Sequence, residues 1–244
     1  MMNHREIIDL LLDANCVFRI SNMTNDQLAD SFGHEFGILK AYDQNNPHHD
    51  RDLLTHTLDV LDAIHFMDLP PHDALCLALA ALLHDVGKPA TARLKQNRTV
   101  FYGHPDVSRS IADKLLHSYG FSEDIISRVL FLICYHDIFI NYKLPSELTR
   151  TSNPYLKTIN KDSVAKHLQY IHDESITKYN FYPTSNDQRL LLYLCIADAS
   201  AQAETVCING TVTDTRNNKL ARLHSIMSFL PMSERGDASN ILYS

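Results

Sequence analysis

The segment ALLHDVGKPAT, residues 81–91, ends an apolar run with an imidazole next to a carboxylate, His84 and Asp85. Side chains of these two types together are typical ligands of first-row metal ions. The dipeptide is not distinctive by itself, because a random chain of this composition would contain about one, whereas this sequence contains five. The surrounding residues therefore have to decide whether the pair is a chemical site.

The helical pattern around the pair predicts where its side chains point. His84 continues the apolar face of Leu77 and Ala80 at helical spacing, so we expect it to face the core at the last turn of its helix. Asp85 follows at the C-terminal end, where the helix dipole is negative and a carboxylate is poorly placed. A metal cation or the ammonium group of Lys88 would offset that charge.

Asp198 is the clearest polar residue on a predicted buried face. It lies four residues after Leu194 in a strongly apolar helical segment. A buried carboxylate needs a paired charge or a bound metal. Three histidines hold comparable positions. His56 lies beside an apolar helix face, His136 lies at the end of one, and His104 lies at the entry to a helix.

Six residues from separate helices could thus converge on one interior point, and they are His56, His84, Asp85, His104, His136 and Asp198. Taken singly, an inward histidine is more often a hydrogen-bonded core residue. Mixed imidazole and carboxylate donors suit Mn, Fe, Co, Ni or Zn, and the two aspartates also permit Mg. Together the six favour a site for one or two divalent metal ions.

The elements that must position these residues are predicted to be helices. Apolar residues recur at helical spacing over eight segments: residues 3–14, 53–67, 72–85, 106–119, 122–136, 161–178, 187–203 and 215–230. Strand signals are confined to a short hairpin near 93–103, with its turn at Gln96-Asn97, and to an Asn-Gly turn in 206–213. We expect an all-α helical bundle with at most a short β-hairpin near 93–103.

Composition limits the classes of partner. The net charge of -7 argues against an extended nucleic-acid interface, which relies on neutralising many phosphates, but leaves room for a small anionic substrate. The five cysteines form no CxxC pair, which indicates a reducing cytoplasm. The longest apolar run, residues 74–83, is too short to span a bilayer, and the N-terminus lacks the pattern of a secretory signal. We expect a cytoplasmic protein without membrane contact, and its oligomeric state stays open.

The order of the ligands carries a family resemblance. His56, then His84-Asp85, then Asp198 resembles the H...HD...D signature of the HD superfamily of metal-dependent phosphohydrolases. The segments NNPHHDRDLLTHTLDVLDAI, LALAALLHDVGKPAT, VFYGHPDVSRSIADKLL and LLLYLCIADASAQ resemble the HD domain attached to bacterial CCA-adding tRNA nucleotidyltransferases. The resemblance covers residues 35–203, within one expected domain of residues 1–244 that ends in a C-terminal helix and tail at 204–244. No nucleotidyltransferase head precedes it, so CCA addition is not expected.

The resemblance also implies roles for individual residues. Asp85 would bridge two metals and be catalytic, with His56, His84 and Asp198 completing the first site and His104 and His136 binding the second. His48 would match a histidine that precedes the first metal histidine in the family. Arg109 stands where a small residue is more usual, and we count it with His48 and Lys88 as a candidate substrate-binding residue.

Lys88 is the best candidate for a catalytic residue that is not a ligand. An ammonium group one turn past the pair can meet the charge that builds on phosphoryl oxygens in the transition state. Its alternative role is a charge at the helix C-terminus. The segment from Gly87 to Gly103 contains four basic residues and no acidic one, and either attracts phosphate or forms a solvated hairpin. The other HD pairs at His49, His72 and His172 are interpreted as surface pairs.

The predicted function is a metal-dependent phosphohydrolase. The resemblance implies a small nucleotide or phosphate-ester substrate, either a phosphomonoester or a phosphodiester, including 2′,3′-cyclic phosphates, attacked by a metal-activated water. Two other classes stay open. One is a di-iron oxygenase of the HD fold, which uses the same ligand set. The other is a non-catalytic binding module in which the metal only staples helices together.

Overall fold

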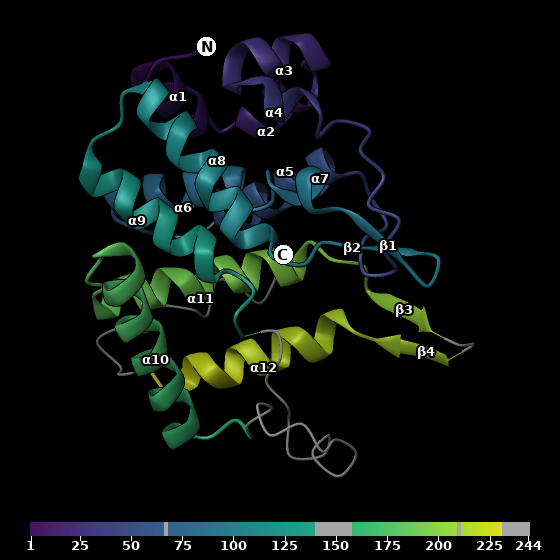
Figure 1. Ribbon diagram of the computed structural model, residues 1–244, viewed down its shortest axis with the longest axis vertical. Helices are drawn as coiled ribbons and strands as arrows, with labels where there is room; N and C mark the ends of the chain where they lie inside the picture. The colour runs from purple at the N-terminus through teal and green to yellow at the C-terminus, as the bar shows by residue number, and fades with distance from the viewer. Residues whose placement is uncertain (66–67, 140–157, 209–210, 231–244) are drawn as a thin grey trace.

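The computed structural model describes residues 1–65, 68–139, 158–208 and 211–230, and these form mainly α-helices (Figure 1). The all-α expectation is confirmed. Each of the eight predicted segments contains a helix: α1 (His4–Leu11), α5 (Leu53–His65), α6 (Pro71–Leu83), α8 (His104–Tyr119), α9 (Glu123–Tyr135), α10 (Lys161–Tyr179), α11 (Ser185–Ser200) and α12 (Arg216–Ser228). The predicted C-terminal tail beyond residue 230 lies outside the described residues.

Four shorter helices were not predicted from the sequence: α2 (Cys16–Ser21), α3 (Asn25–Phe32), α4 (His34–Gly37) and α7 (Lys88–Thr91). Each has eight residues or fewer, which is too short for a period of 3.6 to stand out. α3 nevertheless carries a local signal. The Thr24 hydroxyl accepts from the backbone N–H of Gln27, whose side chain in turn accepts from the backbone N–H of Thr24, and this capping box fixes the start of the helix.

Two antiparallel hairpins accompany the helices. Strands β1 (Arg93–Lys95) and β2 (Arg98–Val100) form the hairpin expected near 93–103, and Gln96 and Asn97 hold its turn with positive φ angles of 50° and 61°. Strands β3 (Thr205–Ile208) and β4 (Thr211–Asp214) form a second hairpin between α11 and α12. The expectation of at most one hairpin is therefore exceeded, because the weaker strand signal at 206–213 is also realised.

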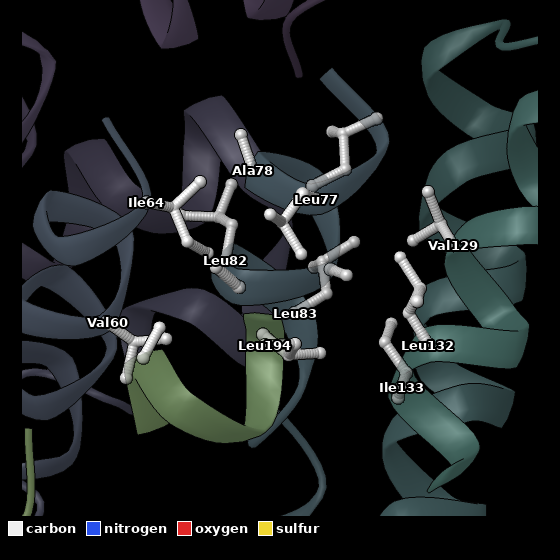
Figure 2. Close-up of a cluster of buried hydrophobic side chains, with 14 of the residues drawn as sticks. Val60, Ile64, Leu77, Ala78, Leu82, Leu83, Val129, Leu132, Ile133 and Leu194 are labelled. Atoms are coloured by element: carbon white, nitrogen blue, oxygen red, sulfur yellow. The ribbon is translucent and has the colours of Figure 1, made fainter. Parts of the chain in front are cut away.

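The core is built around α6. This helix is apolar on all sides, and its residues from Leu75 to Leu83 are all buried because α5, α9 and α11 pack around it. Figure 2 shows Leu77 and Leu83 of α6 on the side that faces Val129, Leu132 and Ile133 of α9, with Leu194 of α11 below Leu83. α12 then packs along α11, and the second hairpin extends from the same side of the molecule (Figure 1). The central helix thus holds the ends of its neighbours in fixed positions.

Candidate metal centre

The six predicted ligands lie at or near the ends of five helices that meet in the core. His84 and His136 are the C-cap residues of α6 and α9, and His104 is the first residue of α8. His56 lies in the first turn of α5, and Asp198 in the last turn of α11. All six side chains, Asp85 included, are buried. The structure therefore brings together every residue of the predicted ligand set.

The carboxylate of Asp85 lies between two pairs of histidines. Its Oδ2 atom is 3.2 Å from Nε2 of His84 and 3.5 Å from Nε2 of His56. Its Oδ1 atom is 3.2 Å from Nε2 of His104 and 3.8 Å from Nε2 of His136. Asp198 joins the first pair, with Oδ1 3.1 Å from Nε2 of His56. One carboxylate thus faces two separate groups of imidazole nitrogens.

Backbone carbonyls fix the orientation of the rings. Nδ1 of His84 is 2.8 Å from the Ala81 carbonyl oxygen, and Nδ1 of His136 is 2.7 Å from that of Ile133. His104 makes the same contact three residues back, at 2.9 Å. A carbonyl oxygen only accepts hydrogen bonds, so each Nδ1 has to carry the proton, and in the neutral ring Nε2 offers its lone pair. These nitrogens face the Asp85 carboxylate as ligands do.

Several buried atoms at this point lack a hydrogen-bond partner among the described residues. They are Nε2 of His56, Nε2 of His84 and both carboxylate oxygens of Asp85. The close approaches given above therefore lack the alignment of hydrogen bonds. Leaving such groups without a partner is costly, whereas a cation would satisfy all of them at once. The donor set, imidazole nitrogen with carboxylate oxygen, fits a divalent metal.

The charged side chains of the metal centre shift one another's pKa values. Burial raises the pKa of Asp85, but the charges of His84 and Lys88 outweigh it and hold that pKa well below its usual range. Burial likewise opposes ionisation of Asp198, and the adjacent His56 ring with its charge lowers the pKa of that carboxyl overall. Burial also lowers the pKa of His56, yet the close approach of the Asp198 and Asp85 carboxylates raises it to about 9. The buried cationic and anionic groups of the centre thus stabilise one another.

Three overlapping groups of potential ligands lie among the described residues. His56, His84 and Asp198 form the first, and His84, Asp85 and His136 the second. The third contains His104, His136 and Asp137, the last of which was not predicted from the sequence. Asp137 follows the His136 C-cap directly, so its signal was the HD dipeptide at 136–137. The first two groups share His84 and the last two share His136, so the potential ligands form one continuous cluster.

Gly87 brings the helix that carries His104 close to the HD pair. Its backbone N–H donates to the Ser108 hydroxyl of α8 at 2.9 Å. A Cβ atom at Gly87 would lie 2.5 Å from the Ser108 backbone nitrogen, closer than real Cβ contacts allow. Gly87 is thus required because two backbones pack closely at this position.

A cavity of about 610 Å³ opens onto the centre. Asp85, His104, His136 and Asp198 contribute to its lining, together with residues of the β1–β2 hairpin, of the loop before α5 and of α12. Backbone contacts join these parts, because the Thr99 N–H donates to the Asn45 carbonyl at 2.8 Å and the Ala203 N–H to the His48 carbonyl at 2.9 Å. The ligands are therefore reachable by a small substrate.

The candidate substrate-binding residues differ in position. His48 and Lys88 line the cavity. Arg109 is not among its lining residues, and its guanidinium carbon instead lies 4.0 Å from the ring centroid of Tyr179 on α10. Five residues along a helix rotate a side chain by about 140°, so Arg109 faces away from His104. The structure gives Arg109 a packing contact and no place in the cavity.

The expectation of a surface position is wrong for His49. This residue lines the cavity, with Nε2 3.4 Å from Nζ of Lys88 and its ring centroid 4.8 Å from that of His56. The side chain of Gln44, which is buried and was also missed, accepts from Nζ of Lys88 at 3.0 Å. Both precede α5 in an irregular segment, where no periodic pattern indicates which side chains point inward.

The other two pairs that were expected at the surface, at His72 and His172, differ in how far their aspartates are exposed. His172 is partly exposed beside Asp173, with Nδ1 3.2 Å from Oδ1, as expected. His72 is also exposed but its Nε2 lies 3.2 Å from Asp124, while its neighbour Asp73 is buried and pairs with Arg128. Only the pair at 84–85 lies at the middle of the histidine cluster.

A helical domain in which five helix ends bring histidines and aspartates around one buried carboxylate defines a metal-binding domain. The sequence model of the HD domain family matches residues 53–201, well over half of the chain, and the protein belongs to the HD domain family. HD domains bind divalent metals and form a superfamily of metal-dependent phosphohydrolases. The family resemblance predicted from the sequence is thus confirmed.

A relative among well-characterised proteins is the CC-adding tRNA nucleotidyltransferase of Thermus thermophilus. It is 32% identical over 133 residues, which are 54% of this chain and 30% of that protein. The chain therefore spans less than a third of the length of this relative. Within the described residues, none of the helices is long and apolar enough to cross a bilayer.

Proposed function

We propose that the protein is a metal-dependent phosphohydrolase that acts on nucleotide-type phosphomonoesters or phosphodiesters, cyclic ones included. The observation that carries the proposal is the position of Asp85. It faces Nε2 atoms from two pairs of histidines, has Nζ of Lys88 at 2.6 Å from Oδ2, and lines a cavity of small-molecule size. Ligands, a cation for phosphate and an access route therefore occur together.

The residues of the site have different roles in the proposed reaction. His56, His84 and Asp198 would hold one divalent ion, and His104 and His136 a second, with Asp85 between them. A divalent ion at this position lowers the pKa of a water molecule and so provides a nucleophile at neutral pH. The Nδ1 contacts to backbone carbonyls keep the rings from turning, which preserves the donor geometry through a catalytic cycle.

Lys88 would bind the phosphoryl oxygens. Its ammonium group lies at the cavity wall next to Asp85 and is held by Gln44 and His49. A buried cation of fixed position stabilises charge that develops in the transition state without first having to reorganise. We count His48 among the substrate-binding candidates because it lines the same cavity, and we make no such claim for Arg109.

The proposal is tested by phosphate release from a panel of phosphomonoesters, cyclic nucleotides and dinucleotides, with each of Mn, Fe, Co, Ni, Mg and Zn supplied in turn. Asp85→Asn should reduce release by at least about 10³-fold, since it removes the charge shared by both groups of ligands. Asp173→Asn, in the surface HD pair, is the matched control and should behave as the wild type.

Two outcomes would replace the proposal with another function. A reaction that consumes oxygen and stops under anaerobic conditions would indicate a di-iron oxygenase, because hydrolysis needs no oxygen. The protein could also bind metal, unfold without it and turn over no substrate of the panel. It would then be a non-catalytic binding module whose metal only stabilises the fold. Equal phosphate release by wild type and Asp85→Asn would contradict the assignment of the site.

A further inference from the structure

Two basic side chains line the cavity apart from Lys88, and the metal centre does not account for either. Arg98 comes from strand β2 and Lys219 from helix α12. The metal-centre carboxylates in the cavity, Asp85 and Asp198, face the histidines. Asp137, the third carboxylate of the lining, groups with His104 and His136. The acidic groups thus gather at the metal centre.

Arg98 has no counter-charge of its own. Among the described residues its guanidinium takes part in no ion pair or side-chain hydrogen bond, although the residue is only partly exposed and lines the cavity. Its strand is fixed by two contacts of the next residue, Thr99. The Thr99 backbone N–H donates to the Asn45 carbonyl, and the Thr99 carbonyl accepts from Asn46 Nδ2 at 3.0 Å. The guanidinium is therefore presented by a fixed backbone.

Lys219 is attached to the metal centre through one amide. Its ammonium group donates to Oε1 of Gln202, and Nε2 of Gln202 donates to Oδ1 of Asp198 at 3.3 Å. A neutral amide oxygen satisfies one of the three N–H donors and leaves the positive charge uncompensated. No carboxylate lies within 4 Å of this ammonium group in the part of the chain that the structure describes.

The positive charges act together on their neighbours. Burial, together with the charges of Lys219 and Arg98, lowers the pKa of His48 to about 4. Burial is the main reason that the pKa of Lys219 is lowered, and the charges of Arg222 and Lys88 act in the same direction, against those of Asp198 and Asp137. The charges of Lys219 and Arg98 thus reach the same point of the cavity, at His48, where a positive charge is disfavoured and an anion is favoured.

We propose that Arg98 and Lys219 form a second anion-binding subsite in the cavity, so that the substrate carries a further phosphate or similar anionic group besides the one that is hydrolysed. This inference rests on the proposed function for the identity of the reacting group. Lys219 belongs to α12, beyond residues 53–201 that match the family. The metal centre is therefore a family feature, whereas part of the second subsite comes from this chain's own C-terminal helix.

Binding of defined ligands tests the subsite without any turnover. We would titrate adenosine 5′-monophosphate, adenosine 5′-diphosphate and adenosine 3′,5′-bisphosphate into the metal-free protein by calorimetry. The wild type should bind at least one of the two ligands with a second phosphate about tenfold more tightly than the monophosphate, because a charge-assisted hydrogen bond is worth that much. The double variant Arg98→Gln/Lys219→Met should lose this preference.

The matched control removes the same two charges elsewhere. Arg93→Gln/Lys166→Met changes an exposed arginine of the same hairpin and an exposed lysine of α10, and it should keep the preference. Single variants Arg98→Gln and Lys219→Met should each lose part of it. Thermal unfolding of every variant confirms that the comparison is made between folded proteins.

Steady-state kinetics of the metal-loaded protein completes the test. The double variant should raise KM for a substrate with two phosphates about tenfold more than it raises KM for p-nitrophenyl phosphate, and any change in kcat should be the same for both substrates. Equal effects on both substrates, or a wild type without preference for the second phosphate, would overturn the subsite. If no substrate is hydrolysed but the binding preference depends on both residues, the proposed function fails and the subsite stands.

Discussion

Nζ of Lys88 lies 2.6 Å from Oδ2 of Asp85, and both side chains are buried. Lys88 begins the short helix α7 and does not cap α6, so its role is not that of a charge at a helix C-terminus. The contact has the distance of an ion pair without the alignment of a hydrogen bond, since Oδ2 has no hydrogen-bond donor. The ammonium group is thus held beside the ligand by Gln44 and His49, which leaves its third N–H to donate to a substrate oxygen.

Replacing Lys88 by methionine is expected to lower kcat for phosphate release about 10²- to 10³-fold, because one preorganised donor to a developing oxyanion is lost. Metal content, measured by atomic emission, should stay at the wild-type level. Lys95→Met removes an exposed lysine of the adjacent hairpin and is the control. Loss of bound metal in Lys88→Met would instead show that Lys88 supports the ligands.

The positions that the sequence predicts best are those on regular helices. His84 and His136 continue apolar faces, and the periodicity that predicts α6 and α9 also predicts that both rings point inward. Gln44 and His49 support Lys88 from an irregular loop, where contacts at long sequence separation determine orientation. Local pattern carries no information about such contacts, which explains why His49 was placed on the surface.

Helix rotation explains the other difference. In the sequence, Arg109 is a candidate substrate-binding residue because it stands where a small residue is more usual in the family, and it follows His104 by five residues. On a helix the two side chains point in different directions, and Arg109 stacks on Tyr179. Lys219 is a residue of the cavity that the sequence did not indicate. The amphipathic pattern predicts its helix, but it does not show that α12 packs beside α11 and brings the ammonium group to Gln202.

Metal removal should destabilise the protein, because the buried atoms of Asp85, His56 and His84 lose their shared partner. A metal present at 100 times its Kd stabilises the folded state by about 2.7 kcal/mol, which corresponds to a rise in Tm of roughly 5–10 °C for a chain of this size. Differential scanning fluorimetry with and without chelator measures it. His84→Gln should lose the response and His172→Gln should keep it. An unchanged Tm in the wild type would contradict the metal centre.

His48 should make stability fall at acidic pH. Its folded-state pKa is about 4, below the ordinary 6.5, because of burial and the charges of Lys219 and Arg98. The unfolded chain therefore takes up a proton first, so the contribution is fully present above pH 6.5 and is lost as the pH falls towards 4. His48→Gln should remove it.

The expected size of the His48 effect is about 1 kcal/mol, discounted because the ring is partly exposed, or roughly 2–4 °C in Tm. We would compare the drop in Tm between pH 6.5 and pH 4.5 in the metal-free wild type and in His48→Gln. His224→Gln is a useful comparison, because burial also lowers the pKa of that histidine outside the cavity. An identical pH dependence of wild type and His48→Gln would contradict the assignment.

Arg128 connects three helices away from the metal centre. Nη1 lies 2.7 Å from Oδ1 of Asp73 at the start of α6, and Nε pairs with Asp187 in the first turn of α11. Both carboxylates are buried, and Asp187 also accepts from the Thr184 backbone N–H at 2.8 Å, which fixes the start of α11. The guanidinium thus neutralises two charges that have little access to water.

Arg128→Met is expected to lower the free energy of unfolding by about 3–5 kcal/mol, because in the described ranges it leaves the buried Asp187 without a cationic partner and Asp73 with Arg189 alone, at 3.7 Å. Arg51→Met is the matched control, since Arg51 pairs with Asp59 at 2.6 Å on the surface, and it should cost at most about 1 kcal/mol. Urea unfolding followed by circular dichroism measures both. Phosphate release per folded molecule should not change in either variant, because Arg128 contacts neither the ligands nor the cavity lining among the described residues. Equal costs for the two variants would show that the carboxylates of Asp73 and Asp187 find other partners or water, and that Arg128 does not fix the starts of α6 and α11.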